Sequence, residues 1–367
     1  MSWLRSTAGC LAALVLLACM GRPAAQAPSR IVVVGDVHGD LAALVDILVD
    51  AGVIDKRRSW KGGTAVVVQT GDLPDRGPDS RKVMDLLIDL EKQARKAGGR
   101  VHALLGNHEV MNMLGDLRYV TPEEYASYKT LDSEQLRETV FVANADPARR
   151  EDPVYRSAWM ADKPLGWVEL MQAFSKQGKY GRWLRQHDTV VKIGTTLLLH
   201  GGISPKYAAL QADEVNSRIR AALASNTPRA ETLLTDEEGP LWYRGLALAP
   251  EAALGAHVDA LLAFHGVSRI VIGHTVAPGV VLPRFGGKVI LNDVGLSAVY
   301  GGPRSSLEIK GDEVSVRHRG RLLPMPKTPG LSEYLDAARA LEPAGSVLNE
   351  WIEKGATWPP PLATPER

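Results

Sequence analysis

The chain has 367 residues, enough for one large domain or two ordinary ones, and 45% of them are hydrophobic, so a sizeable core can form. Its 43 basic and 42 acidic side chains leave a formal net charge of +1. This balance gives no electrostatic reason to expect nucleic acid or an anionic membrane as the main partner.

The N-terminal residues are typical of an export signal. An apolar run at residues 11–20 is too short to span a bilayer comfortably. Ala25-Gln-Ala27 is a candidate cleavage site, and Leu16-Leu-Ala-Cys19 offers the alternative of a bacterial lipoprotein box with a lipid anchor at Cys19. An uncleaved anchor helix is a third interpretation. We assign residues 1–27 to an export signal and expect a periplasmic or surface-anchored protein whose mature chain has no transmembrane span.

Both cysteines, Cys10 and Cys19, lie in this leader. Once the leader is removed, the mature chain holds no cysteine, or only a lipidated one. Disulfide bonds therefore do not stabilise the protein despite its export. Catalysis by a cysteine nucleophile is excluded for the same reason.

Strand and helix patterns alternate along the chain from residue 30. Short β-branched runs predict strands, and segments with apolar residues at helical spacing predict helices. The predicted strands are 31–34, 65–69, 101–105, 189–193, 195–199, 269–272, 288–291, 306–310 and 313–318. The predicted helices are 41–51, 80–96, 208–224 and 331–341. This alternation predicts an α/β domain over residues 30–325.

Two segments differ from this pattern. Residues 111–185 are charged and contain no clear strand, so we predict a helical insertion there. Residues 326–367 are rich in proline and predict a C-terminal extension with one helix. Gly194 and the pair Gly311-Asp312 predict hairpin turns between neighbouring strands.

Polar side chains follow five of the predicted strands, at the point where each strand ends. They are Asp36 and His38 after 31–34, Asp72 after 65–69, Asn107 and His108 after 101–105, His200 after 195–199, and His274 after 269–272. If these strands share one direction, the loops meet at the carboxyl edge of the sheet, where open α/β sheets place their sites.

The residue types in these loops match hard or borderline divalent cations, because they are carboxylates, an amide and imidazoles without sulfur. The candidate ligands are Asp36, His38, Asp72, Asn107, His200 and His274. They exceed the needs of one catalytic ion and suit two ions, about 3.5–4 Å apart, that share Asp72. Each residue alone has a simpler explanation as a turn, cap or packing residue, but their joint occurrence at strand ends favours a metal site.

The motifs GDVHG, GDLPDRG, GNHE, HGG and GHT, in this order over about residues 31–303, resemble those of the metallophosphoesterases, and within them the phosphoprotein phosphatase family. The stretches 109–119, 239–245 and 293–301 further resemble the Shewanella-like protein phosphatases. The resemblance implies a calcineurin-like α/β sandwich of two mixed sheets flanked by helices. It also implies a dimetal phosphomonoesterase that acts on phosphoproteins, with phosphotyrosine preferred by some members, or on a small phosphate ester. With the leader, we expect this enzyme to be exported.

The resemblance assigns the metal ligands residue by residue. The first ion would be bound by Asp36 and His38, the second by Asn107, His200 and His274, and Asp72 would bridge the two. Mn²⁺, Fe and Zn²⁺ all suit such ligands, and we expect Mn²⁺.

The resemblance also assigns the reacting groups. A metal-bridging hydroxide would attack phosphorus, and His108, oriented by Asp75, would protonate the leaving oxygen as general acid. Arg76 and Arg244 would hold the phosphate, with a contribution from Asn107.

The chain departs from some relatives at Gly273-His-Thr-Val276, which lacks the second histidine of the GHxH motif found in many diesterases. With both arginines present, this favours a monoesterase over the alternative of a nucleotide or dinucleotide phosphohydrolase or a phosphodiesterase. A non-enzymatic fold that binds a partner through the insertion is the third alternative, which the complete ligand set disfavours. We expect Tyr300 to lie near the metals. We expect the insertion to cover the site; the alternative is that it is a scaffold that does not contact the substrate.

Overall fold

The computed structural model describes residues 28–225, 232–326 and 330–360. The predicted export signal, with both cysteines, lies outside the described residues. Within the described ranges, no helix combines the length and the apolar character needed to cross a bilayer.

Six strands form the first sheet, in the order β11-β10-β9-β1-β2-β3. Their bounds are β1 (Ile31–Val34), β2 (Val66–Gln69), β3 (Arg100–Ala103), β9 (Ser305–Lys310), β10 (Glu313–His318) and β11 (Arg321–Pro324). β1, β2 and β3 are parallel, and β9, β10 and β11 continue the sheet in antiparallel fashion. All four residues of β1 are buried, as expected for a β-branched run in the middle of a sheet that is covered on both faces.

The second sheet has five strands in the order β4-β5-β6-β8-β7. Their bounds are β4 (Val190–Ile193), β5 (Thr196–Leu199), β6 (Arg269–Ile272), β7 (Leu282–Arg284) and β8 (Val289–Leu291). β5, β6 and β8 are parallel, with an antiparallel strand on either edge. Both sheets are therefore mixed. β7 was not predicted because it is only three residues long and contains Pro283, which suits an edge strand.

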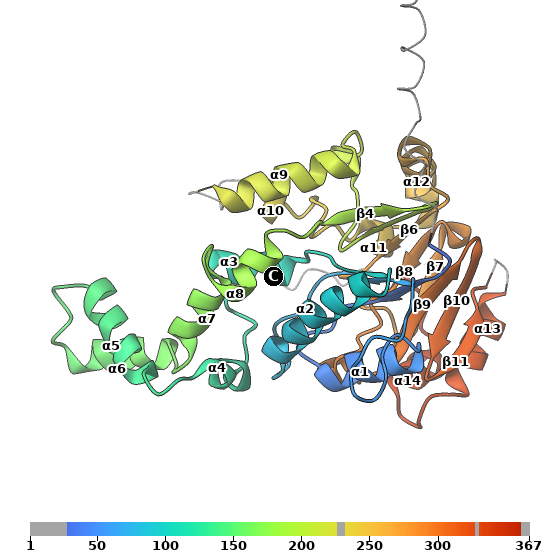
Figure 1. Cartoon of the computed structure of the whole chain (residues 1–367). Coiled ribbons are helices and arrows are strands. Elements are labelled where there is room, and N and C mark those ends of the chain that lie inside the picture. The colour runs from blue at the N-terminus through green and yellow to red at the C-terminus, as the bar shows by residue number, and fades with distance from the viewer. Residues whose placement is uncertain (1–27, 226–231, 327–329, 361–367) are drawn as a thin grey trace, which may run out of the picture.

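Helices flank the two sheets (Figure 1). The helices outside the insertion and the C-terminal segment are α1 (Leu41–Asp50), α2 (Ser80–Lys96), α3 (Asn107–Leu114), α9 (Ala212–Ala224), α10 (Thr232–Thr235), α11 (Gly245–Leu248) and α12 (Glu251–His265). α2 packs on β3, and α9 packs on β4. The start of α1 is fixed by Asp40, whose side chain accepts a hydrogen bond from the Ala43 amide. α12 was not predicted because its sequence EAALGAHVDALLAFH spreads apolar residues around the whole helix.

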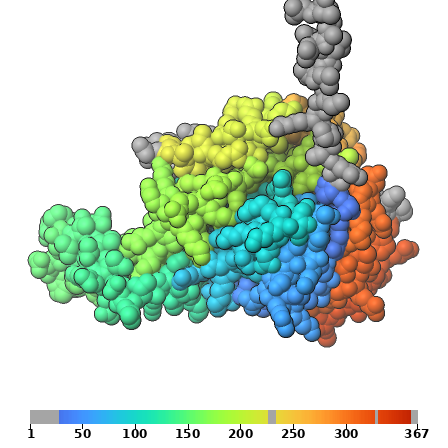
Figure 2. All heavy atoms as spheres, in the orientation of Figure 1, coloured from blue at the N-terminus to red at the C-terminus, as the bar shows by residue number. Residues whose placement is uncertain are grey.

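The predicted insertion is helical in the structure. Its helices are α4 (Pro122–Tyr128), α5 (Ser133–Asn144), α6 (Pro153–Asp162), α7 (Trp167–Phe174) and α8 (Lys179–Leu184). α5 and α6 extend away from the body of the molecule, whereas α7 and α8 lead back to it (Figures 1 and 2). α6 has no buried residue. The distal helices therefore do not cover the site that the strand ends form.

The C-terminal segment contains two helices, α13 (Leu331–Arg339) and α14 (Val347–Glu353), where one was predicted. The second is short, and only Leu348 among its apolar residues is fully buried, so its hydrophobic pattern is weak. Its start is fixed by Ser346, whose side chain accepts a hydrogen bond from the Asn349 amide. Tyr334 in α13 donates a hydrogen bond of 2.7 Å to the Val281 carbonyl, so the segment is packed on the body rather than separate from it.

Candidate metal centre

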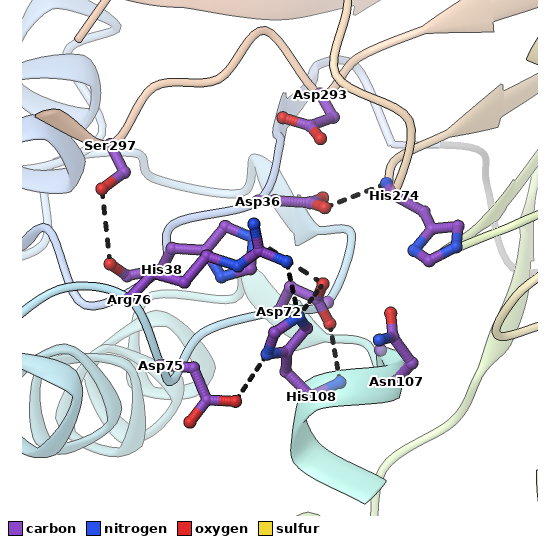
Figure 3. Close-up of polar contacts among 12 residues, drawn as sticks. Asp36, His38, Asp72, Asp75, Arg76, Asn107, His108, His274, Asp293 and Ser297 are labelled. Atoms are coloured by element: carbon purple, nitrogen blue, oxygen red, sulfur yellow. Dashed lines mark hydrogen bonds and ion pairs between the residues drawn. The ribbon is translucent and has the colours of Figure 1, made fainter. Parts of the chain in front are cut away.

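The predicted polar residues come together where the carboxyl ends of the parallel strands of both sheets meet. Nδ1 of His200, after β5, lies 2.8 Å from the carbonyl oxygen of Thr70, after β2. The His274 amide, after β6, donates to Oδ2 of Asp36, after β1, over 2.9 Å (Figure 3). The loops belong to two sheets, because β5 and β6 pair with β8 rather than with β1. This confirms the predicted sandwich of two mixed sheets, and the loops meet where the carboxyl ends of both sheets come together.

Two overlapping groups of buried side chains could each hold a cation. The first consists of His38, Asp72 and His108, and the second of Asp72, His200 and His274, with ligand atoms within 4.8 Å of one another in each group. Asp72 is common to both, which is the position predicted for a bridging ligand. The chain thus offers candidate ligands for two ions.

Each predicted histidine ligand has one ring nitrogen next to a backbone carbonyl and the other beside a further candidate ligand. The pairs are His38 Nδ1 with Pro74 O at 3.2 Å, His200 Nδ1 with Thr70 O at 2.8 Å, and His274 Nε2 with Trp242 O at 3.1 Å. Such contacts fix the tautomer and the ring orientation of metal-binding histidines. Burial also lowers the pKa of His38 to about 3 and the pKa of His274 well below its usual value, which favours the neutral, metal-binding form.

The atoms around His200 indicate that a cation belongs between them. With Nδ1–H directed at the Thr70 carbonyl, Nε2 is an acceptor, yet it lies 2.9 Å from Oδ1 of Asn107 and 3.3 Å from Oδ1 of Asp72. Nδ1 of His274, 3.2 Å away, is also an acceptor when Nε2–H faces the Trp242 carbonyl. Acceptors that face one another are unfavourable without a positive charge between them.

The carboxylates of the site support the same conclusion. Oδ1 of Asp36 is shielded from solvent and has no hydrogen-bond partner among the described residues. Burial, together with the nearby Asp293 and Asp72, raises the pKa of Asp36 well above its usual value. Burial also opposes ionisation of Asp72, but the imidazoles of His200 and His108 outweigh it and hold its pKa well below the usual value. Divalent cations would satisfy these buried charges, so the residues present fit the predicted ions.

Two buried carboxyl groups were not predicted as functional residues. Glu109 accepts backbone hydrogen bonds from Asp72, Leu73 and Gly106 at 3.0, 2.6 and 2.7 Å, and so joins the loops after β2 and β3. The sequence feature that could have identified Glu109 is an acidic residue at the third position of α3. Burial raises the pKa of Asp293 to about 6. Asp293 begins the stretch 293–301 that resembles the Shewanella-like protein phosphatases, but no role was assigned to it, because only the fold places it beside Asp36.

Two glycines allow the backbone to approach the candidate ligands closely. A Cβ atom at Gly106 would lie 2.2 Å from Oδ1 of Asp72. A Cβ atom at Gly273 would lie 2.5 Å from Oδ1 of Asp36. Any side chain at these positions would displace a carboxylate of the site, which gives a steric reason for glycine in the GNHE and GHT motifs.

His108 lies between a carboxylate and a guanidinium (Figure 3). Its Nδ1 is 2.5 Å from Oδ2 of Asp75, and its Nε2 is 3.3 Å from Nη2 of Arg76. The Asn112 side chain holds the other oxygen of Asp75 at 2.9 Å. Burial lowers the pKa of His108, but Asp72 and the hydrogen bond to Asp75 outweigh this and raise it overall. Asp75 thus holds a proton on Nδ1 and favours the protonated ring, whereas Nε2 faces the Arg76 donor as an acceptor in the geometry shown.

A cleft of about 330 Å³ opens over these groups. Arg76 and Arg244 both line it, and Nη1 of Arg244 is anchored 2.7 Å from the His274 carbonyl oxygen. Tyr119 and Tyr300 flank Arg76, with ring centroids 4.8 and 5.4 Å from its guanidinium carbon. Tyr300 lies near the candidate ligands as predicted, 5.8 Å from the His38 ring. Within the insertion range, Tyr119 alone is among the described residues that line the cleft.

The fold and this cluster of metal-binding side chains are those of a metal-dependent phosphoesterase. Residues 29–278 match the calcineurin-like phosphoesterase family model, and the chain belongs to that family. The protein is accordingly a phosphoesterase hydrolase.

Individual relatives narrow this assignment. The chain is 33% identical to an uncharacterized protein of Schizosaccharomyces pombe, covering 81% of this chain and 83% of that protein. It is 29% identical to Shewanella-like protein phosphatase 2 of Arabidopsis thaliana, covering 78% and 76%. The solved structure of a cold-active protein tyrosine phosphatase from a psychrophilic Shewanella species is similar, with a TM-score of 0.63 and 29% identity over 81% of this chain and 80% of that one. These similarities agree with the predicted resemblance to the Shewanella-like protein phosphatases.

Proposed function

We propose that the protein is a dimetal phosphomonoesterase that removes phosphate from proteins, with His108 as its general acid. The observation that carries this proposal is the pairing of His108 with Asp75 next to two metal-binding groups and the Arg76 guanidinium. A monoester is favoured because two arginines can neutralise the two charges of a terminal phosphate. The names of the Arabidopsis and Shewanella relatives support a protein substrate.

Each functional residue of the chain would have its own role in the reaction. When bound, the two cations would lower the pKa of water and polarise the phosphoryl group. Arg76 and Arg244 would bind the phosphate oxygens and orient phosphorus in the cleft. His108 would hold a proton at Nε2 and pass it to the leaving oxygen, while Asp75 would keep the imidazole charged and correctly oriented through Nδ1. Asn107 would contact both a cation and the phosphate.

We also propose that phosphotyrosine is preferred over phosphoserine. The supporting observation is that three aromatic side chains line the cleft, Tyr119, Trp242 and Tyr300. A phenyl ring would gain offset or edge-to-face contacts with these side chains, worth about 0.5–1.5 kcal/mol for each pair. An aliphatic phosphoserine side chain is too short to make the same contacts.

The metal and the location of the protein belong to the same proposal. We expect Mn²⁺ at both sites, with Fe or Zn²⁺ as the alternatives that the same ligands accept.

We expect residues 1–27 to direct export, with either cleavage after Ala27 or a lipid on Cys19. Mass spectrometry of the mature N-terminus distinguishes these two outcomes, and an intact N-terminus in the cytosol would contradict export.

The test is hydrolysis by the purified mature chain after chelation and Mn²⁺ addition. The substrates are matched phosphotyrosine and phosphoserine peptides, a bis-aryl phosphodiester and a set of nucleotides. We expect metal-dependent phosphate release from the peptides, faster for phosphotyrosine. Turnover of the diester or the nucleotides alone would preserve the metal site and overturn the proposed substrate class.

A further inference from the structure

The two arginines of the cleft are held in different ways. Nη1 of Arg244 donates hydrogen bonds to the His274 carbonyl oxygen at 2.7 Å and to the Thr275 hydroxyl at 3.2 Å. Within the described residues, the guanidinium of Arg76 makes a single hydrogen bond, from Nη2 to Nε2 of His108 at 3.3 Å, and its Nε is buried without a partner. Contacts other than hydrogen bonds must therefore fix the orientation of Arg76.

The rings of two tyrosines provide such contacts. The guanidinium carbon of Arg76 lies over both rings, 4.8 Å from the centroid of Tyr119 and 5.4 Å from the centroid of Tyr300. Separations below about 6 Å are those of cation–π contacts. An arginine that stacks on an aromatic face keeps its N–H donors, because these lie in the plane of the guanidinium. The two rings can therefore orient Arg76 and leave its donors free for phosphate oxygens.

Tyr119 also supports the backbone of Arg76. The Arg76 amide donates a hydrogen bond of 2.9 Å to the carbonyl oxygen of Tyr119. Asp75 has φ of 71° and Arg76 has φ of 64°, so two consecutive non-glycine residues lie in the left-handed region, where the surrounding structure must hold them. Tyr119 thus contacts both the backbone and the side chain of Arg76.

The local structure places Tyr119 beside the proposed acid. The helix α3 begins with Asn107 and His108 and ends at Gly115, whose left-handed conformation, with φ of 76°, turns the chain. The next helix, α4, is capped by the side chain of Thr121. Tyr119 lies in the short link between these helices, and its ring centroid is 5.0 Å from that of His108. The start of the insertion is therefore fixed at the catalytic cleft.

Tyr300 approaches the same guanidinium from a different part of the chain. Its segment is attached to the loop after β1, because the Ala298 amide donates a hydrogen bond of 2.9 Å to Oδ2 of Asp40. The Arg76 guanidinium is therefore flanked by rings that two separate segments bring together.

We propose that Tyr119 and Tyr300 are positioning residues that form an aromatic clamp on Arg76. The clamp fixes the plane of the guanidinium and leaves its donors to the phosphate. The proposal rests on the proposed function, because it assumes that Arg76 binds phosphate. It gives the start of the insertion a role in phosphate binding that differs from any contact between Tyr119 and an aromatic ring of the substrate.

Inorganic phosphate is the probe that tests the clamp, because it has no aromatic ring that could contact the tyrosines directly. Its Kd for the Mn²⁺-loaded protein is measured by isothermal titration calorimetry. We expect this Kd to rise about fivefold in Tyr119→Leu and in Tyr300→Leu, the effect of losing a partly exposed cation–π contact. Tyr119→Phe keeps the ring and should restore binding. The Tyr119 side chain is 40% exposed, so Tyr119→Leu should keep a thermal midpoint close to that of the wild type.

The matched control is Tyr155→Leu in α6, the distal part of the insertion. Arg149 lies over the Tyr155 ring, 4.4 Å from its centroid, so this substitution removes the same kind of contact outside the cleft. It should leave the Kd for phosphate unchanged.

A double-mutant cycle shows whether the Tyr119 ring acts through Arg76. Arg76→Ala should weaken phosphate binding, and adding Tyr119→Leu to it should weaken binding no further. Equal effects of Tyr119→Leu with and without Arg76 would assign the ring a general structural role and overturn the clamp. An unchanged Kd in either Tyr119→Leu or Tyr300→Leu, or failure of Tyr119→Leu to fold, would also overturn it. If Arg76→Ala bound phosphate as tightly as the wild type, the role of Arg76 in the proposed function would itself be refuted.

Discussion

Nδ1 of His108 lies 2.5 Å from Oδ2 of Asp75, although the two residues follow different strands and are separated by 33 positions in the chain. Both side chains are almost completely shielded from solvent, at 2% and 0% exposure. A buried contact of this length between an imidazole and a carboxylate stabilises the protonated ring. Since His108 also lines the cleft, the pair is positioned to deliver a proton there.

Replacing His108 with asparagine should remove the acid while leaving the metal site intact. We expect kcat for a phosphoserine peptide to fall by about 10²–10⁴-fold, and kcat for p-nitrophenyl phosphate to fall much less, because nitrophenolate leaves without protonation. Metal content, measured by inductively coupled plasma mass spectrometry, should stay at the wild-type value. Equal losses for both substrates would assign His108 to metal binding, in agreement with its place in the group of His38, Asp72 and His108.

Asp75→Asn should move the alkaline limb of the pH–rate profile to lower pH. Asp72 and Asp75 raise the pKa of His108 against the effect of burial, and the acid works only while it is protonated. The rate therefore falls as the pH rises through this pKa, and loss of the Asp75 charge lowers the pKa. The profile of kcat/KM for a phosphoserine peptide measures the shift. Asp79→Asn, in the same loop but paired with the exposed Lys82, should leave the limb in place.

Asp72→Asn should reduce the bound metal more than replacement of a ligand that serves one ion. Asp72 belongs to both candidate groups, and the substitution removes the negative charge that both cations would share. After Mn²⁺ reconstitution we expect a stoichiometry below one ion per chain, compared with about one for His38→Ala. Asp46→Asn, at an exposed position on α1, is the control. Retention of two ions by Asp72→Asn would rule out a bridging role.

Gly106→Ala tests the close approach of backbone and ligand. The added methyl group would meet Oδ1 of Asp72 at 2.2 Å and the Asp72 amide nitrogen at 2.6 Å, so a ligand or the backbone that carries it must shift. We expect weaker metal binding and a loss of activity. The same substitution at Gly255, where a Cβ atom meets no neighbour in the interior of α12, should stabilise the protein by about 1 kcal/mol. Thermal unfolding and metal titration of both variants check this contrast.

Glu342→Gln should weaken the attachment of the C-terminal segment. The Glu342 side chain is 1% exposed and pairs with His318 at 2.9 Å and Arg319 at 2.7 Å. Burial raises its pKa, but these two partners outweigh burial and lower the pKa to about 2. The stabilisation is present above pH 4.5 and is lost as the pH falls toward 2. We expect a loss of about 2 kcal/mol at pH 7, measured by urea unfolding, and a smaller loss near pH 2. A loss that is independent of pH would contradict the ion pair.

The sequence by itself determined most of the strands and the residues placed at their ends. Ile31–Val34 is an unbroken β-branched run, and Asp36 and His38 follow it directly, so strand and candidate ligands could be predicted together. Ser80–Lys96 was predicted with the bounds it has in the structure, because its apolar residues recur at helical spacing. Local patterns of this kind depend on neighbouring residues, which the sequence contains in full.

The tertiary structure decided how these pieces meet. The division of the strands between two sheets depends on pairings between residues more than 70 positions apart, such as Leu197 with Ile270. The burial of Asp293 beside Asp36, and the complete burial of Glu124, depend on contacts that no local period encodes. The sequence therefore determined which chemical groups the site contains. Only long-range packing decided their mutual positions, because a side chain's burial and electrostatic environment are set by residues remote from it in the chain.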